Sequence, residues 1–209
     1  MPKVVAEGRR TINNVERSAS LLLIKTIFTA ILVVICIFMK SEYFYLPIHL
    51  SLITACTISV PSFILALEPN HERVKGNFML KVISKSFPPA LTVVFNVVMI
   101  VLYKNHFAIS ENITSTLIVM MTATTGFIFL YRICRPFNLL RGTLFVSLVG
   151  VFVYMILYHF TFFDLSKINS GTMLLYVVFA ICSVYIFDKL NLLVGLILDK
   201  FDKSSVRDK

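Results

Sequence analysis

Six long apolar runs divide the chain, and short polar stretches separate them. The runs cover residues 19–39, 47–67, 87–103, 114–131, 142–163 and 172–187. A helix needs about 20 mostly apolar residues to cross the hydrocarbon core of a bilayer. The runs are continuous and lack the alternation of apolar and polar positions that is typical of a membrane β-barrel. The pattern predicts an all-α integral membrane protein, a bundle of six transmembrane helices.

The composition supports this class of protein. Hydrophobic residues make up 57% of the 209 residues and charged residues only 15%. An ordinary soluble domain has about 45–50% apolar and about 25% charged residues. The connections between the runs are too short to hold a soluble domain of their own. The lipid bilayer is therefore the first partner that the sequence predicts.

The placement of Lys and Arg predicts how the bundle is oriented. Sixteen of the 20 fall on the side of the bundle that carries both termini, three fall on the other side, and Lys25 lies inside the first run. Cytoplasmic segments carry the excess of basic residues, so we expect both termini in the cytoplasm. The basic residues are spread over four separate segments, which argues against nucleic acid as a partner.

Three regions follow from these patterns. Residues 1–18 read as a cytoplasmic stalk helix that leads into the first span. Residues 19–188 form the six-helix membrane domain, and residues 189–209 form a basic cytoplasmic tail. The tail can either extend the last helix or lie on the membrane surface, and the sequence does not choose between the two.

Lys25 is the clearest charge inside an apolar run. It can snorkel to the headgroups through its long side chain. Alternatively it faces the bundle as a fixed positive charge, because ionisable residues inside membranes are functional candidates. Thr26 and Thr29 follow it within one turn and can either offer oxygens to a ligand or bond to carbonyls of their own helix.

Pro61 lies in the middle of the second run, where it has no N–H and crowds the carbonyl of Thr57. Thr54, Thr57 and Pro61 share one helical face. A freed carbonyl beside hydroxyls makes an oxygen-rich patch, and such patches at broken membrane helices coordinate small cations. A simple packing kink is the alternative.

Two stretches carry a resemblance to a known family. "VVAEGRRTINNVERSASLLLIKT", residues 4–26, resembles the stalk and fifth membrane helix of the P-type cation-pumping ATPases, with Glu7-Gly8-Arg9 and Asn13-Asn14 as its characteristic pieces. "TISVPSFILALEPNHERV", residues 57–74, is similar to their sixth membrane helix and the loop that follows it. The likeness is to the bacterial calcium or general cation pumps and implies that the six spans are the last six of such a pump.

The resemblance also implies what lies outside these 209 residues. The sequence holds no DKTGT, GDGxND, TGE or PEGL motif. We therefore expect a fragment or one half of a split pump, with no cofactor and no enzymatic activity of its own. ATP and Mg²⁺ would be used by cytoplasmic domains, on a separate chain if the pump is split. Glu68 would begin the turn that docks on the phosphorylation domain.

The family's ion ligands can be carried over residue by residue. Four positions of this chain fall on ligand positions: Thr54, Thr57, Thr26 and Thr29. Thr29 replaces a glutamate and Ile58 replaces an aspartate, so both membrane carboxylates are absent, and Lys25 adds a positive charge. The resemblance implies transport of an inorganic cation, with Ca²⁺ as one candidate.

The expected function is thus the membrane transport domain of a P-type ATPase in the plasma membrane, with Pro61, Lys25 and Glu68 in structural or gating roles. Two alternatives remain open on the residues alone. One is a small carrier or channel that works without ATP. The other is a non-catalytic membrane interaction subunit. The stalk favours the pump, because a free-standing carrier has no need of a cytoplasmic lever.

Overall fold

The computed structural model describes residues 2–68, 77–107, 109–167 and 169–207. Over these ranges the chain is helical and contains no strand. The helical elements, in chain order, are α1 (Pro2–Met39), α2 (Pro47–Thr54), η1 (Ala55–Ser59), α3 (Val60–Leu67), α4 (Phe78–Phe107), α5 (Glu111–Ile133), α6 (Leu139–Tyr158) and α7 (Ser170–Arg207).

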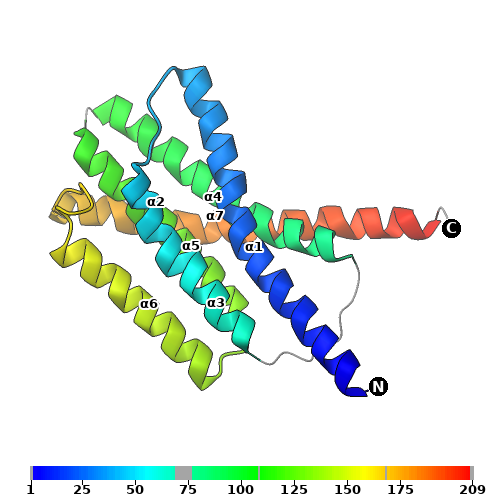
Figure 1. Cartoon of the computed structure of the whole chain (residues 1–209). Helices are drawn as coiled ribbons and strands as arrows, with labels where there is room; N and C mark the ends of the chain where they lie inside the picture. The colour runs from blue at the N-terminus through cyan, green and yellow to red at the C-terminus, as the bar shows by residue number, and fades with distance from the viewer. Residues whose placement is uncertain (1, 69–76, 108, 168, 208–209) are drawn as a thin grey trace.

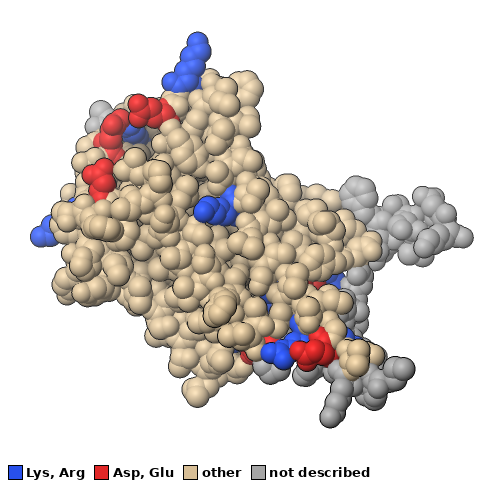
Figure 2. Space-filling model, viewed as in Figure 1, with Lys and Arg blue, Asp and Glu red and all other residues tan. Residues whose placement is uncertain are grey.

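Six helical segments are long and apolar enough to cross a membrane, which confirms the predicted fold class; α2, η1 and α3 together form the second of them. Successive spans run in opposite directions, and the two ends of the chain lie toward the same end of the bundle (Figure 1). Charged side chains gather at the two ends and leave a broad band between them that is uncharged on this face except for one small basic spot (Figure 2). The chain is an integral, multi-pass membrane protein.

Several helices extend further than the apolar runs indicated. The expected stalk and the first span form one continuous helix, α1, and α7 continues from the last span into the tail. α4 begins at Phe78, about two turns before the apolar run. The fifth run was expected to remain in the membrane to residue 163, but α6 ends at Tyr158 and residues 160–164 form a turn. Composition marks the apolar part of a helix and not its full length.

The core of the bundle is built around α4 and α5. α1 packs along α4, which also contacts α5 and α7. In the most apolar 18-residue stretch of α5, 72% is buried inside the bundle, whereas in that of α7 only 17% is buried. α5 buries apolar and hydroxyl side chains around most of its circumference, as expected of a helix with neighbours on several sides.

The second span widens at its centre instead of unwinding. Residues Ala55–Ser59 form a π turn, in which the N–H of Val60 donates to the carbonyl of Ala55 five residues back. In this register the next carbonyl is that of Cys56, and Pro61 cannot donate to it because proline has no N–H. The sequence had pointed to the carbonyl of Thr57, which is the partner that an ordinary α-helix would have lost.

Candidate functional site

The π turn packs directly against the middle of α5. Thr57 is 2% exposed and faces Gly126. A Cβ atom at position 126 would lie 2.9 Å from both Cβ and Cγ2 of Thr57. Real Cβ contacts are not this short, so the close approach of the two helices depends on glycine at this position.

A small cavity lies beside this contact. Its volume is about 20 Å³, enough for one water molecule or a small ion. The polar residues in its lining are Thr54, Thr57, Thr122 and Thr125, and the remaining lining is mostly apolar. The structure therefore brings Thr54 and Thr57 together, as the shared helical face predicted. It adds two threonines from α5 that the sequence did not single out.

The hydroxyls of Thr57, Thr122 and Thr125 already have partners. Thr57 Oγ1 donates to the carbonyl of Ile53 at 2.8 Å. The hydroxyls of Thr122 and Tyr45 lie 2.6 Å apart. Tyr45 precedes the second span, and burial raises the pKa of its phenol. The ring therefore stays neutral at physiological pH, and the cavity has no ionised side chain in its lining.

A second polar cluster adjoins the cavity through Thr125. Asn96 on α4 donates to Thr125 Oγ1 at 3.2 Å, and Ser183 on α7 donates to Asn96 Oδ1 at 2.8 Å. All three side chains are buried. We call them the Asn96 cluster. Sequence reasoning missed it, although an asparagine inside an apolar run is a signal that could have revealed Asn96.

The other three candidates lie away from the cavity. Thr26 is exposed and donates to the carbonyl of Leu22 on its own helix at 3.5 Å. Thr29 is half-buried and lies beside the hydroxyl of Tyr43. Lys25 is half-buried on α1 and does not line the cavity. The structure thus places Thr54 and Thr57 at the cavity and Thr26 and Thr29 away from it.

Buried charge is concentrated at the end of the bundle that carries both termini and most of the Lys and Arg residues, which we call the basic end. In the parts of the chain that the structure describes, the buried carboxylates are Glu16 and Glu68, and both pair with basic residues. The same parts contain no group of three or more His, Cys, Asp or Glu side chains that could hold a metal ion. Any cation at the centre of the bundle would meet neutral oxygens from this chain.

The side chain of Glu68, the first residue of the expected docking turn, is buried and bonded to residues of α1 and α6. Arg141 Nε on α6 donates to its two carboxylate oxygens at 2.9 and 2.8 Å. Asn138 donates to Oε1 at 2.7 Å, and Arg17 on α1 reaches Oε2 at 3.4 Å. The remainder of the expected docking turn, residues 69–75, lies outside the described residues.

The first helix is also tied to the backbone at the end of α3. Asn14 Nδ2 donates to the carbonyls of Ala66 and Glu68 at 2.7 and 2.9 Å. Arg10 donates to the carbonyl of Leu67 at 3.0 Å. These carbonyls lack partners within their own helix because α3 ends here. The residues that join α1, α3 and α6, namely Asn14, Arg17, Glu68, Asn138 and Arg141, are called the Glu68 cluster below.

No family model matches the chain. The probable cation-transporting ATPase exp7 of Streptococcus pneumoniae is 35% identical to it over 161 residues, which are 73% of this chain and 21% of that protein. The calcium-transporting ATPases CtpE of Mycolicibacterium smegmatis and Mycobacterium tuberculosis are each 36% identical over 103 residues, 44% of this chain and 13% of theirs. The chain is homologous to the P-type cation-transporting ATPases.

The match to these ATPases is confined to part of their length. The chain spans about a fifth or less of the curated relatives it matches. Its six apolar helices fit the C-terminal membrane region of a P-type ATPase, so the resemblance drawn from residues 4–26 and 57–74 is confirmed. The cation-binding roles of the four threonines remain predictions.

Proposed function

We propose that this chain is the membrane transport domain of an ATP-driven cation pump, and that the cation passes the cavity between the π turn and α5. The observation that carries the proposal is the set of four threonines that line the cavity, beside a helix that Pro61 keeps out of regular α geometry. ATP and Mg²⁺ would act in domains outside these 209 residues. The plasma membrane is the expected location.

The chemistry of the cavity bears on which cation is carried. Calcium prefers six to eight oxygen ligands, carboxylates among them. The threonines here supply neutral oxygens only. A monovalent cation is compatible with this set, whereas Ca²⁺ would need carboxylates from outside this chain. Calcium remains a candidate because some relatives are named as calcium transporters, but its binding here would require carboxylates from outside this chain.

The Glu68 cluster gives the proposal a route for coupling. It joins the N-terminal half of α1 to the end of the span that contains the π turn. A movement of the stalk would reach α3 through Asn14 and Arg17. The direction of coupling is from the cytoplasmic end toward the cavity.

The test uses membranes in which the protein is assembled as it occurs in its cell. The gene is edited to Thr54→Val with Thr57→Val, and ATP-driven uptake of Ca²⁺, Mg²⁺, Mn²⁺, Na⁺ and K⁺ is measured in inverted vesicles. We expect uptake of at least one cation to require the gene and to fall several-fold in the double variant. Valine keeps the branched shape of threonine and has a methyl group in place of the hydroxyl.

Thr143→Val on α6 is the matched control, because this threonine also bonds to its own helix but is exposed and does not line the cavity. It should leave uptake unchanged. If deletion of the gene has no effect on any ATP-driven uptake, the pump is rejected. Flux that persists without ATP would instead indicate a carrier or channel, and normal uptake in the double variant would remove the cavity from the pathway.

A further inference from the structure

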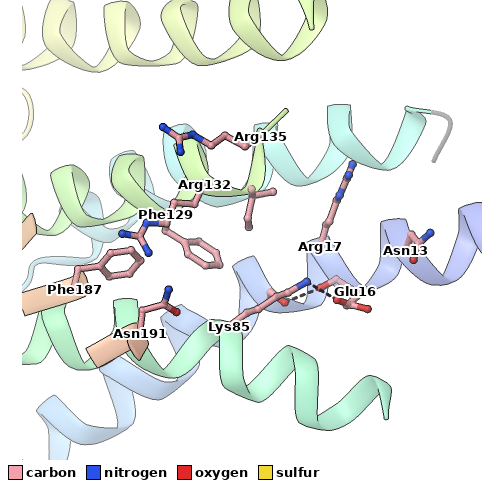
Figure 3. A pocket seen from close by; sticks show the side chains of 11 residues that line it. Asn13, Glu16, Arg17, Lys85, Phe129, Arg132, Arg135, Phe187 and Asn191 are labelled. Atoms are coloured by element: carbon pink, nitrogen blue, oxygen red, sulfur yellow. Dashed lines mark hydrogen bonds and ion pairs between the residues drawn. The ribbon is translucent and has the colours of Figure 1, made fainter. Parts of the chain in front are cut away.

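A large, partly open cavity lies at the basic end of the bundle, separate from the cavity at Thr57. Its volume is about 440 Å³. Residues from α1, α4, α5 and α7 surround it, and Figure 3 shows the paired side chains of Glu16 and Lys85 across the opening from Arg132. We call this cavity the basic vestibule. Its charged lining residues are Glu16, Arg17, Lys85, Arg132 and Arg135.

The lining carries more positive than negative charge. Lys85 pairs with Glu16, and Arg132 pairs with Asp188 just outside the lining. Arg135 has a neutral partner, because its guanidinium donates to the Tyr131 hydroxyl at 2.7 Å and lies 4.6 Å from the centre of that ring. The excess of guanidinium groups over carboxylates in a recessed site attracts an anion. Arginine is suited to a phosphate, which it can bind through two parallel N–H groups.

One wall of the basic vestibule is apolar. Phe129 and Ile133 come from α5 and Phe187 comes from α7, both of which are membrane spans. The guanidinium of Arg132 lies 4.2 Å from the ring centre of Phe187, at the junction between the apolar wall and the polar rim. A ligand that fills this space therefore needs a negatively charged head next to an apolar part.

We propose that the basic vestibule binds the phosphate headgroup of an anionic phospholipid. Its residues lie near the ends of the apolar runs of four spans, where lipid headgroups are expected, and basic pockets between membrane helices bind such headgroups. Arg132 and Arg135 hold the phosphate, and Phe129 and Phe187 contact the first carbons of the acyl chains. Free phosphate shares the headgroup's charge but has no apolar part.

The proposal is tested with the full chain, purified from its membrane with any subunit it retains. Native mass spectrometry measures how tightly the protein keeps phosphatidylglycerol and phosphatidylcholine in mixed micelles. We expect a preference for phosphatidylglycerol of roughly 25-fold, about fivefold from each of the two arginines. The variant Arg132→Gln with Arg135→Gln should lower it by roughly fivefold for each basic side chain lost.

Lys40→Gln with Lys104→Gln makes the same change of charge at the opposite end of the bundle and should leave the preference intact. Arg135→Gln alone, which breaks no ion pair among the described residues, covers the case in which the double variant does not fold. An equal preference for the two lipids, or a preference that Arg135→Gln and the double variant leave unchanged, overturns the proposal. Inorganic phosphate that competes at equal concentration with the lipid would overturn the assignment to a lipid.

Discussion

Polar residues serve different purposes at the basic end of the bundle and at its centre. At the basic end, full charges are buried in pairs, with Glu68 held by Arg141 and Glu16 by Lys85. At the centre, the buried polar groups are neutral hydroxyls and one amide, gathered around Thr57 and Asn96. The difference separates the region where this chain buries paired charges from the region where it buries neutral polar groups.

Physical chemistry accounts for the division. A buried charge is costly unless it is paired, and the pair then holds its two elements firmly together. Hydroxyls can bond to their own helix, so they enter the membrane centre at little cost and can turn to another partner. Four experiments test this comparison, in order of expected effect.

Glu68→Ala should have the largest effect on stability. It leaves the buried guanidinium of Arg141 without its carboxylate, and breaking such a pair costs about 3–5 kcal/mol. Unfolding in detergent, followed by circular dichroism, measures the loss. Glu111→Ala is the control, because its pair with Lys104 is exposed and should contribute nothing measurable. Equal stability of the two variants would show that the Glu68 cluster does not join the helices.

Gly126→Ala should have the next largest effect, because the added methyl group overlaps the side chain of Thr57. Overpacking of this kind costs about 1–3 kcal/mol. The same measurement applies, with Gly150→Ala as the matched change at a helical glycine where an added methyl group would meet nothing within 4 Å. A stable Gly126→Ala protein would mean that the π turn and α5 can move apart freely.

Asn96→Leu should be milder. The hydroxyls of Thr125 and Ser183 keep their bonds to carbonyls of their own helices at 3.0 and 2.8 Å. Bonds between membrane helices are worth about 0.6–2 kcal/mol, so the loss should fall in this range. A double-mutant cycle with Ser183→Ala isolates the pair. A coupling energy of zero would contradict the Asn96 cluster as a link between α4 and α7.

Thr57→Val should change stability least. It removes one hydroxyl bond within a helix, worth about 0.5–1.5 kcal/mol, and keeps the shape that packs on Gly126. Thermal unfolding and cation uptake are measured on the same protein. The comparison predicts a small loss of stability and a clear loss of uptake. A large loss of stability with normal uptake would make Thr57 a structural residue.

Much of the fold could be predicted because apolar length is a strong signal. The second run, 47–67, coincides with the span as the structure has it. Pro61 also marked correctly the helix that departs from α geometry. The kind of departure could not be predicted, because the missing N–H of proline is compatible with both a π turn and a kink. The packing of Thr57 on Gly126 could not be predicted either, because the two residues are 69 positions apart.

The site was harder to predict than the fold. Glu68 and Arg141 lie in separate segments, 73 residues apart, and no pattern in the sequence pairs them. The shared face of Thr54 and Thr57 was visible because helical spacing is local. The contributions of Thr122 and Thr125 required knowing that α5 is the helix that faces the π turn. Local spacing was therefore informative, and contacts between distant segments were not.

The π turn has a further consequence for how the second span tolerates insertions and deletions. A residue of an α-helix is rotated by roughly 100° from the one before it, so one residue more or less in a regular span would turn every later side chain to a new neighbour. Here α2 contacts α5 and α3 contacts α1, with the extra residue of the turn between them. The extra residue therefore sets the rotation of α3 relative to α2. Removing one residue from 55–59 would rotate one half against the other, so that either α2 would lose its contacts with α5 or α3 would lose its contacts with α1.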